Sequence, residues 1–245
     1  MSVIVTSIRE RYLKTLDNIK SAAQSVGRDP ESVKLVVVTK AQPVEVARAV
    51  IKAGARILGE NYPEEGVMKL QSLREFKAVE WHMIGHVQSR KAQVVAGNFN
   101  FLHSLDSLKL AKRLDRFCGE AGRTLSALLE FNVGEEGSKS GWPAWDESHW
   151  PSLLGELSEV FSLPNLIVRG LMTMPPLGGT AESSRSYFQK LKRLQGYLSS
   201  QFSDVVFSEL SMGTSGDYEV AVQEGATLVR VGTAIVGVRQ NKTED

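Results

Sequence analysis

The feature that most constrains the fold is a regular alternation of short apolar, β-branched runs with longer amphipathic stretches. Eight such runs occur, at residues 33–40, 56–60, 79–85, 99–105, 125–133, 166–173, 205–211 and 227–233. The stretches between them, such as PVEVARAVIKAGA and SRSYFQKLKRLQGYLSSQF, carry apolar residues near helical spacing. Strands that alternate with helices build parallel sheets, and eight units favour a closed (β/α)8 TIM barrel. Residues 1–26 predict an extra helix before the first strand.

Composition and charge limit the class of protein. The 245 residues are 42% hydrophobic, which suits one core, so residues 1–245 are expected to form a single domain. Lys and Arg total 29 against 28 Asp and Glu, so no basic field favours nucleic acid or an anionic membrane. The single cysteine, Cys118, excludes a disulfide framework within the chain, and a cytoplasmic setting is expected. The N-terminal apolar run is too short for a signal peptide or a membrane span.

Two cationic residues are predicted at one end of the barrel, where the carboxyl ends of the strands form the site in such folds. Lys40 ends the first strand and shares a face with Val38, so its amine is expected at the mouth. Arg230 lies in the last strand and shares its inward face with Leu228 and Gly232. Barrel closure makes these strands neighbours, and two cations together favour an anionic ligand. Taken alone, Lys40 fits a strand-end lysine whose amine lies in solvent better than it fits a covalent site.

The loops after the last two strands are suited to a phosphate group. The first is SMGTSGDYEVAV, with a helix expected near Asp217, and the second is GTAIVG. Glycines allow close approach of the backbone, and hydroxyl and amide groups donate hydrogen bonds to anions. The residues concerned are Ser211, Gly213, Thr214, Ser215, Gly232 and Thr233. Either loop alone is ordinary turn chemistry, but both loops beside two cations favour a phosphate site.

Several other residues follow strands at the same edge, and each also fits loop capping or packing: Glu60, Asn61, His86, Asn132, Met174 and Pro175. The loop at 134–151 is long and polar, which is typical of functional loops. His82 and His86 are four residues apart, but on a strand they would be separated by roughly 13 Å, so no metal site is expected. Nucleotide-binding and hydrolase motifs are absent from the sequence.

Seven segments in order carry a resemblance to a known family: VVVTK, LGENY, WHMIGHVQSRK, FNVGEEGSKSG, RGLMTM, LSMGTSGDYEVAV and GATLVRVGTAIVG. The chain resembles the YggS/PROSC-type pyridoxal phosphate homeostasis proteins, which have the barrel of the alanine racemase N-terminal domain. The resemblance implies that Lys40 holds pyridoxal 5'-phosphate as an aldimine and that Arg230 faces the pyridine nitrogen. It assigns the phosphate to Ser211, Gly213, Thr214, Gly232 and Thr233, and the ring contacts to Asn61 and Met174. The chain departs from the family pattern at Glu130, Phe131 and Thr214.

The expected function is that of a carrier. An arginine does not give up its proton, so the ring nitrogen stays unprotonated and the cofactor is a weaker electron sink. Racemases of this fold also use a tyrosine from a second domain across a dimer, and this chain ends before such a domain. We therefore expect a monomeric protein that sequesters pyridoxal phosphate and delivers it to dependent apoenzymes.

Two alternatives remain open. One is a racemase or related amino-acid-transforming enzyme, with His86, Lys139 or a bound water as the second base. The other is a sugar-phosphate enzyme in which Lys40 acts as a base and no cofactor binds.

Overall fold

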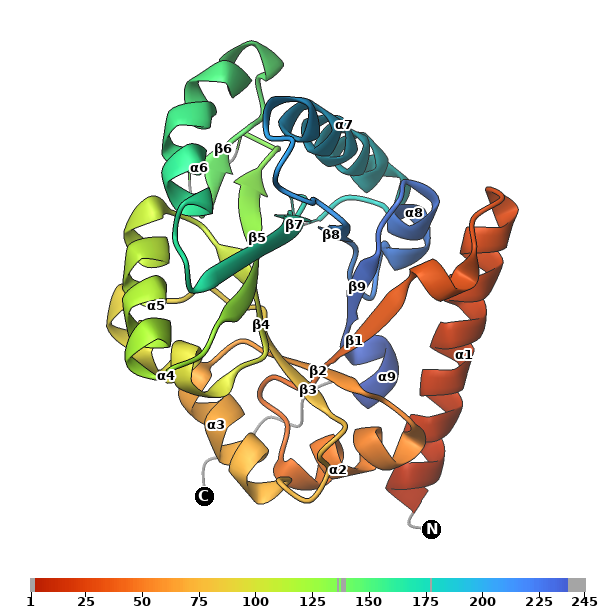
Figure 1. The fold of residues 1–245 in the computed structure, drawn as a ribbon. Helices are drawn as coiled ribbons and strands as arrows, with labels where there is room; N and C mark the ends of the chain where they lie inside the picture. Colours follow the sequence, from red (N-terminus) through yellow and green to blue (C-terminus); the bar gives the residue numbers. More distant parts are fainter. Residues whose placement is uncertain (1–2, 136, 138–139, 177, 238–245) are drawn as a thin grey trace.

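The chain folds into a closed barrel of parallel strands. The computed structural model describes residues 3–135, 137, 140–176 and 178–237. Within them the ring consists of β1 (Lys34–Val38), β2 (Ile57–Glu60), β3 (Glu80–Met83), β4 (Phe101–Leu105), β5 (Leu125–Asn132), β7 (Leu166–Met172), β8 (Glu209–Ser211) and β9 (Leu228–Val231). Their order is β4-β3-β2-β1-β9-β8-β7-β5, and pairing of β4 with β5 closes the ring (Figure 1). The predicted eight-stranded barrel is confirmed.

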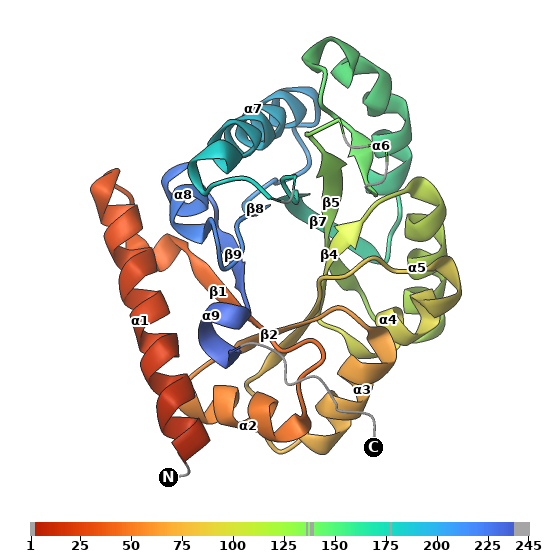
Figure 2. The same ribbon diagram turned by 180° about the vertical axis from the view of Figure 1, so that it is seen from behind.

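Helices cover the outside of the ring, as two opposite views show (Figures 1 and 2). They are α1 (Val3–Ser25), α2 (Val44–Ala53), α3 (Pro63–Ser72), α4 (Ala92–Asn98), α5 (Leu108–Glu120), α6 (Leu154–Phe161), α7 (Arg185–Gln201), α8 (Tyr218–Gln223) and α9 (Thr233–Val236). The extra N-terminal helix is confirmed as α1, which packs against α2, α8 and α9. No helix among the described residues has the length and apolar character needed to cross a bilayer.

Two strands differ from the sequence prediction. The run at 205–211 forms a strand only over Glu209–Ser211, because Val205 and the residues before it make a turn and Val206 is 70% exposed. A short strand that was not predicted, β6 (Trp142–Pro143), lies in the loop after β5 and pairs with Phe131 and Asn132. A two-residue strand that contains proline has no periodicity to detect, so β6 was missed.

The strands separate two apolar regions. Leu228 packs with Val36 and Met172 inside the barrel, whereas Val229 and Val231 belong to the larger core between strands and helices. The alternation predicted for the last strand is therefore correct. The buried polar side chains of His82, His103 and Ser211 also lie inside the barrel, where they contact one another.

Candidate functional site

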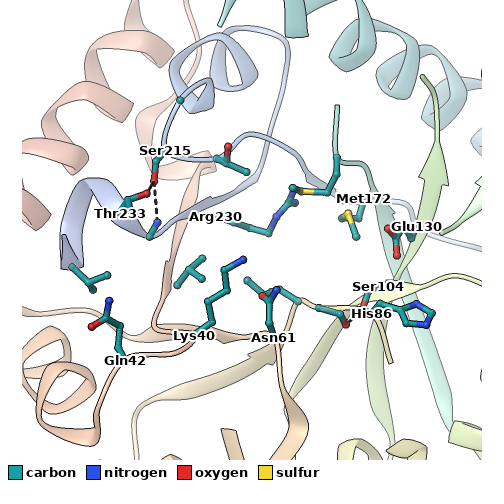
Figure 3. A pocket seen from close by; sticks show the side chains of 18 of the residues that line it. Lys40, Gln42, Asn61, His86, Ser104, Glu130, Met172, Ser215, Arg230 and Thr233 are labelled. Atoms are coloured by element: carbon teal, nitrogen blue, oxygen red, sulfur yellow. Dashed lines mark hydrogen bonds between the residues drawn. The ribbon is translucent and has the colours of Figure 1, made fainter. Parts of the chain in front are cut away.

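A cavity of about 870 Å³ opens at the carboxyl ends of the strands. Seven of the nine site residues predicted from the sequence line it: Lys40, Asn61, Met174, Thr214, Arg230, Gly232 and Thr233. The remaining two, Ser211 and Gly213, lie outside this lining. Figure 3 shows the side chains of Lys40 and Arg230 extending into the same space from neighbouring parts of the ring. The closure of a parallel barrel therefore brings together residues that are 190 positions apart.

Lys40 follows a strand end that is held by buried charges. The Lys69 amine is fully buried and donates hydrogen bonds to the Thr39 carbonyl at 2.6 Å, Glu60 Oε1 at 2.8 Å and Glu65 Oε1 at 2.6 Å. The Thr39 hydroxyl donates to the same Glu60 oxygen at 2.6 Å. Burial raises the pKa of Glu60, and the charge of Lys69 opposes that rise. This cluster fixes the backbone immediately before Lys40, and Glu60 supports the site from behind rather than lining it.

Arg230 is held from several sides within the barrel. Its guanidinium donates to the Ser211 hydroxyl, to the Thr173 carbonyl at 3.0 Å and to the sulfur of Met174 at 2.8 Å. Loss of hydration lowers the pKa of Arg230 to about 10, although nearby carboxylates favour the charged form. The side chain therefore stays a cation at neutral pH and has a defined orientation at the floor of the cavity.

The loops after β8 and β9 are tied together by Ser215. Its hydroxyl oxygen lies 3.4 Å from the Thr233 hydroxyl (Figure 3). It also accepts hydrogen bonds from the amides of Gly232 at 3.1 Å and Ala234 at 3.4 Å. Thr214 donates through its amide and its hydroxyl to Asp217, which directly precedes α8 as the sequence predicted. The two predicted phosphate loops thus form one hydroxyl- and amide-rich wall.

Ser211 and Gly213 have structural contacts that the sequence did not reveal. The Ser211 hydroxyl is buried between the guanidinium of Arg230 and Nδ1 of His103, at 2.8 Å from the latter. Gly213 has φ +90°, and a Cβ there would lie 2.5 Å from the Cβ of Ala221. Glycine is therefore required at 213 by the close packing of α8 against the loop.

The remaining sequence candidates are dispersed. His86 lines the cavity, and its Nδ1 lies 2.8 Å from Asp106 Oδ2 and 3.1 Å from the Ser140 hydroxyl. Asn132 accepts a hydrogen bond from the Gly134 amide at 3.2 Å, which is a loop-capping contact. Pro175 lies outside the cavity lining, and Lys139 lies outside the described residues.

The cavity is also lined by residues that the sequence did not indicate as site residues, among them Gln42, Ser104, Glu130, Met172 and Val236. Gln42 belongs to the turn after Lys40, where the left-handed Ala41 at φ +55° reverses the chain. Ser104 sits near the end of β4, as a search of strand ends could have shown. Gln42 reaches the cavity because of the turn at Ala41, and alanine does not indicate a left-handed backbone, so the sequence could not predict this position.

The two histidines weighed as a metal pair lie in different places. His82 is buried inside the barrel and its Nδ1 lies 2.9 Å from Nε2 of His103, whereas His86 is at the rim. The described part of the chain holds no group of three or more His, Cys, Asp or Glu residues arranged for a metal ion.

Comparison with known proteins decides the family. Residues 14–240 match the family model of the alanine racemase N-terminal domain. The chain belongs to this family. A pyridoxal phosphate homeostasis protein of Vibrio alginolyticus is 39% identical over 239 residues, which are 96% of this chain and 99% of that relative. The resemblance drawn from the seven sequence segments is confirmed.

Two solved structures have the same fold. PipY of Synechococcus elongatus, solved with PLP bound, has a TM-score of 0.80 and 35% identity, and the match covers 94% of this chain and all of that one. An alanine racemase of Clostridium difficile has a TM-score of 0.68 at 18% identity, and the match covers 97% of this chain but 58% of that enzyme. The second likeness concerns the barrel fold alone.

Proposed function

We propose that this protein binds pyridoxal 5'-phosphate in the cavity at Lys40 and serves in the homeostasis of that cofactor. The observation that carries the proposal is that Lys40, the buried Arg230 and the loops after β8 and β9 all line one cavity. A hydrogen bond from the Gly232 amide to Ser215 joins the two loops. The curated relative from Vibrio alginolyticus is named for this role, and PipY was solved with PLP bound.

The donor set of the cavity fits the cofactor. Thr214, Ser215, Gly216, Gly232 and Thr233 line one wall, and a phosphate there would take hydrogen bonds that Thr214 now gives to Asp217 and Gly232 to Ser215. The Lys40 amine would take the aldehyde, Arg230 would face the pyridine nitrogen, and Asn61 and Met174 would contact the ring. When bound, the cofactor supplies an aldehyde that reacts with primary amines.

The nature of the arginine supports a carrier role. A cation with a pKa of about 10 offers no acceptor for a proton on the ring nitrogen, so the ring remains a weak electron sink. The protein would hold the cofactor as a monomer in the cytoplasm and pass it to apoenzymes that require it. Sedimentation at working concentration tests the monomer, and transfer to an apoenzyme followed by its activity tests delivery.

The covalent site is tested by variants of the purified, cofactor-loaded protein. Lys40→Ala is expected to lose the visible absorbance of the bound cofactor, whereas Lys52→Ala, an exposed lysine on α2, is expected to keep it. Borohydride reduction followed by peptide mapping should place the added mass on Lys40. Attachment at another lysine, or absorbance unchanged in Lys40→Ala, would refute the assignment.

One observation favours a second candidate function. His86 at the cavity rim is oriented by Asp106 at 2.8 Å, which is the arrangement of an acid–base pair. An amino-acid-transforming enzyme would use it as the second base. Amino-acid turnover by loaded protein at ordinary enzymatic rates, lost in His86→Ala, would favour this function over the carrier.

A further inference from the structure

A continuous line of polar side chains runs through the barrel from its amino-terminal edge to the cavity. Glu80 Oε2 lies 3.3 Å from His82 Nε2, His82 Nδ1 lies 2.9 Å from His103 Nε2, and His103 Nδ1 lies 2.8 Å from the Ser211 hydroxyl. The Ser211 hydroxyl in turn contacts the guanidinium of Arg230. The four members after Glu80 are at most 4% exposed. The ligand proposed above would therefore meet the last member of a buried chain that begins on the opposite face.

The chemistry of the members allows one direction of hydrogen bonding through neutral imidazoles. Arginine is a donor only, so the Ser211 oxygen accepts from Arg230 and its own proton goes to Nδ1 of His103. His103 must then carry its proton on Nε2 and donate it to Nδ1 of His82. His82 likewise carries its proton on Nε2, which faces the carboxylate of Glu80. Every link has one donor and one acceptor in this arrangement.

The surrounding side chains hold the two rings in place. His82 stacks on Phe101 with ring centroids 4.9 Å apart, and Phe101 meets His103 edge-on at 5.3 Å. Rotation of either ring would break its hydrogen bonds and this packing together. The chain is therefore a fixed structural element rather than a set of independent polar contacts.

We propose that His82, His103 and Ser211 are positioning residues that set the orientation of the Arg230 guanidinium through a one-way hydrogen-bond chain. This inference rests on the proposed function for the identity of the ligand, but not for the chain itself. Ser211 supports the site through the arginine, which accounts for its absence from the cavity lining.

Protonation of an imidazole would break the direction of the chain. A proton on Nδ1 of His103 would place a second donor against the Ser211 oxygen and a second cation near Arg230. Burial lowers the pKa of both histidines, which keeps them neutral at physiological pH. The charged groups that act on His82 are Glu80, Lys34 and Glu209. His103 is affected by the cation of Arg230, and Arg230 itself by the carboxylates of Glu130 and Asp217.

Nuclear magnetic resonance tests the chain without reference to any ligand. The protein has four histidines, and long-range ¹H–¹⁵N correlations distinguish the tautomers of each. Assignment uses His82→Gln and His103→Gln. Both buried rings are expected as neutral Nε2–H tautomers at pH 7 in the full-length protein. An Nδ1–H tautomer of His103, or an imidazolium signal at that pH, would overturn the proposal.

Cofactor titration tests the consequence for Arg230. Ser211→Ala and His103→Leu are each expected to weaken pyridoxal phosphate binding about tenfold. His103→Asn keeps a hydrogen-bond acceptor near the position of Nδ1, so its affinity should lie between that of His103→Leu and that of the natural chain. Thr227→Val removes a bonded hydroxyl near the amino-terminal ends of β8 and β9, outside the cavity lining, and serves as the control, with affinity unchanged. Equal affinity in Ser211→Ala and the natural chain would overturn the positioning role. If the natural protein does not bind the cofactor, the proposed function is wrong, and the histidine tautomers still test the hydrogen-bond chain.

Discussion

Replacement of Lys69 by methionine is expected to lower the free energy of unfolding by about 3–5 kcal/mol at pH 8. Lys69 is fully buried and uses all three of its amine protons, on Thr39, Glu60 and Glu65. Methionine fills a similar volume, so the loss comes mainly from the carboxylate of Glu60, which is itself fully buried and would lack its counter-ion.

The size of this effect depends on pH in a direction that the structure determines. Burial raises the pKa of Glu60 in the folded protein, and removal of Lys69 raises it further. When the pKa of a carboxyl is higher in the folded than in the unfolded protein, its contribution to stability is complete below the unfolded-state pKa. That contribution is lost as the pH rises through the folded-state pKa. The difference between Lys69→Met and the natural chain should therefore shrink as the pH falls from 8 to 5, by up to about 1.4 kcal/mol per pH unit.

Urea unfolding followed by tryptophan fluorescence measures these differences, since the chain has four tryptophans. Lys91→Met is the control, because Lys91 pairs with Glu64 at the surface and such pairs contribute below about 1 kcal/mol. The double variant Glu60→Gln with Lys69→Met should regain most of the loss. A loss that is the same at pH 5 and pH 8, and that the double variant does not relieve, would refute the buried-carboxylate explanation.

Three further predictions concern other parts of the molecule. Burial lowers the pKa of His82 and His103 in the folded protein, so their contribution to stability is complete above the ordinary pKa of about 6.5. Below pH 6.5 the free energy of unfolding should decrease, by up to about 1.4 kcal/mol per pH unit for each ring. The urea midpoint measured between pH 6.5 and 5 checks this, and a midpoint that does not change would contradict it. Arg11 in α1 donates a hydrogen bond to the Ile235 carbonyl in α9 at 2.6 Å, so α1 supports the segment after β9 that lines the cavity. Arg11→Met should therefore weaken pyridoxal phosphate binding about fivefold in a fluorescence titration, and unchanged affinity would show that α1 gives no such support. Gly170→Ala should destabilise by about 3 kcal/mol in urea, because its Cβ would lie 1.8 Å from the Glu209 carbonyl oxygen, whereas Gly97→Ala in α4 meets nothing within 4 Å and should be neutral or slightly stabilising.

The barrel and the positions of its two cations could be predicted from the order of residues. Strand and helix periodicities are local properties, and a count of eight units is enough to favour closure. Once the ring closes, Lys40 and Arg230 must lie at the same mouth, because parallel neighbouring strands end at the same edge. The resemblance then named a cofactor that suits such a site.

Tertiary structure alone decided which polar residues line the cavity and which lie behind it. Lysine is a residue type that is rarely buried, and the burial of Lys69 depends on how α3 packs beside β1 and β2. Ser211 was predicted from the sequence as a phosphate ligand, and only the register of β3, β4, β8 and β9 shows that its hydroxyl lies between His103 and Arg230. Hydrogen-bond partners across a barrel are set by strand register and ring orientation, which involve residues more than a hundred positions apart. Local sequence determines which way a side chain points, and only the assembled ring determines what it meets.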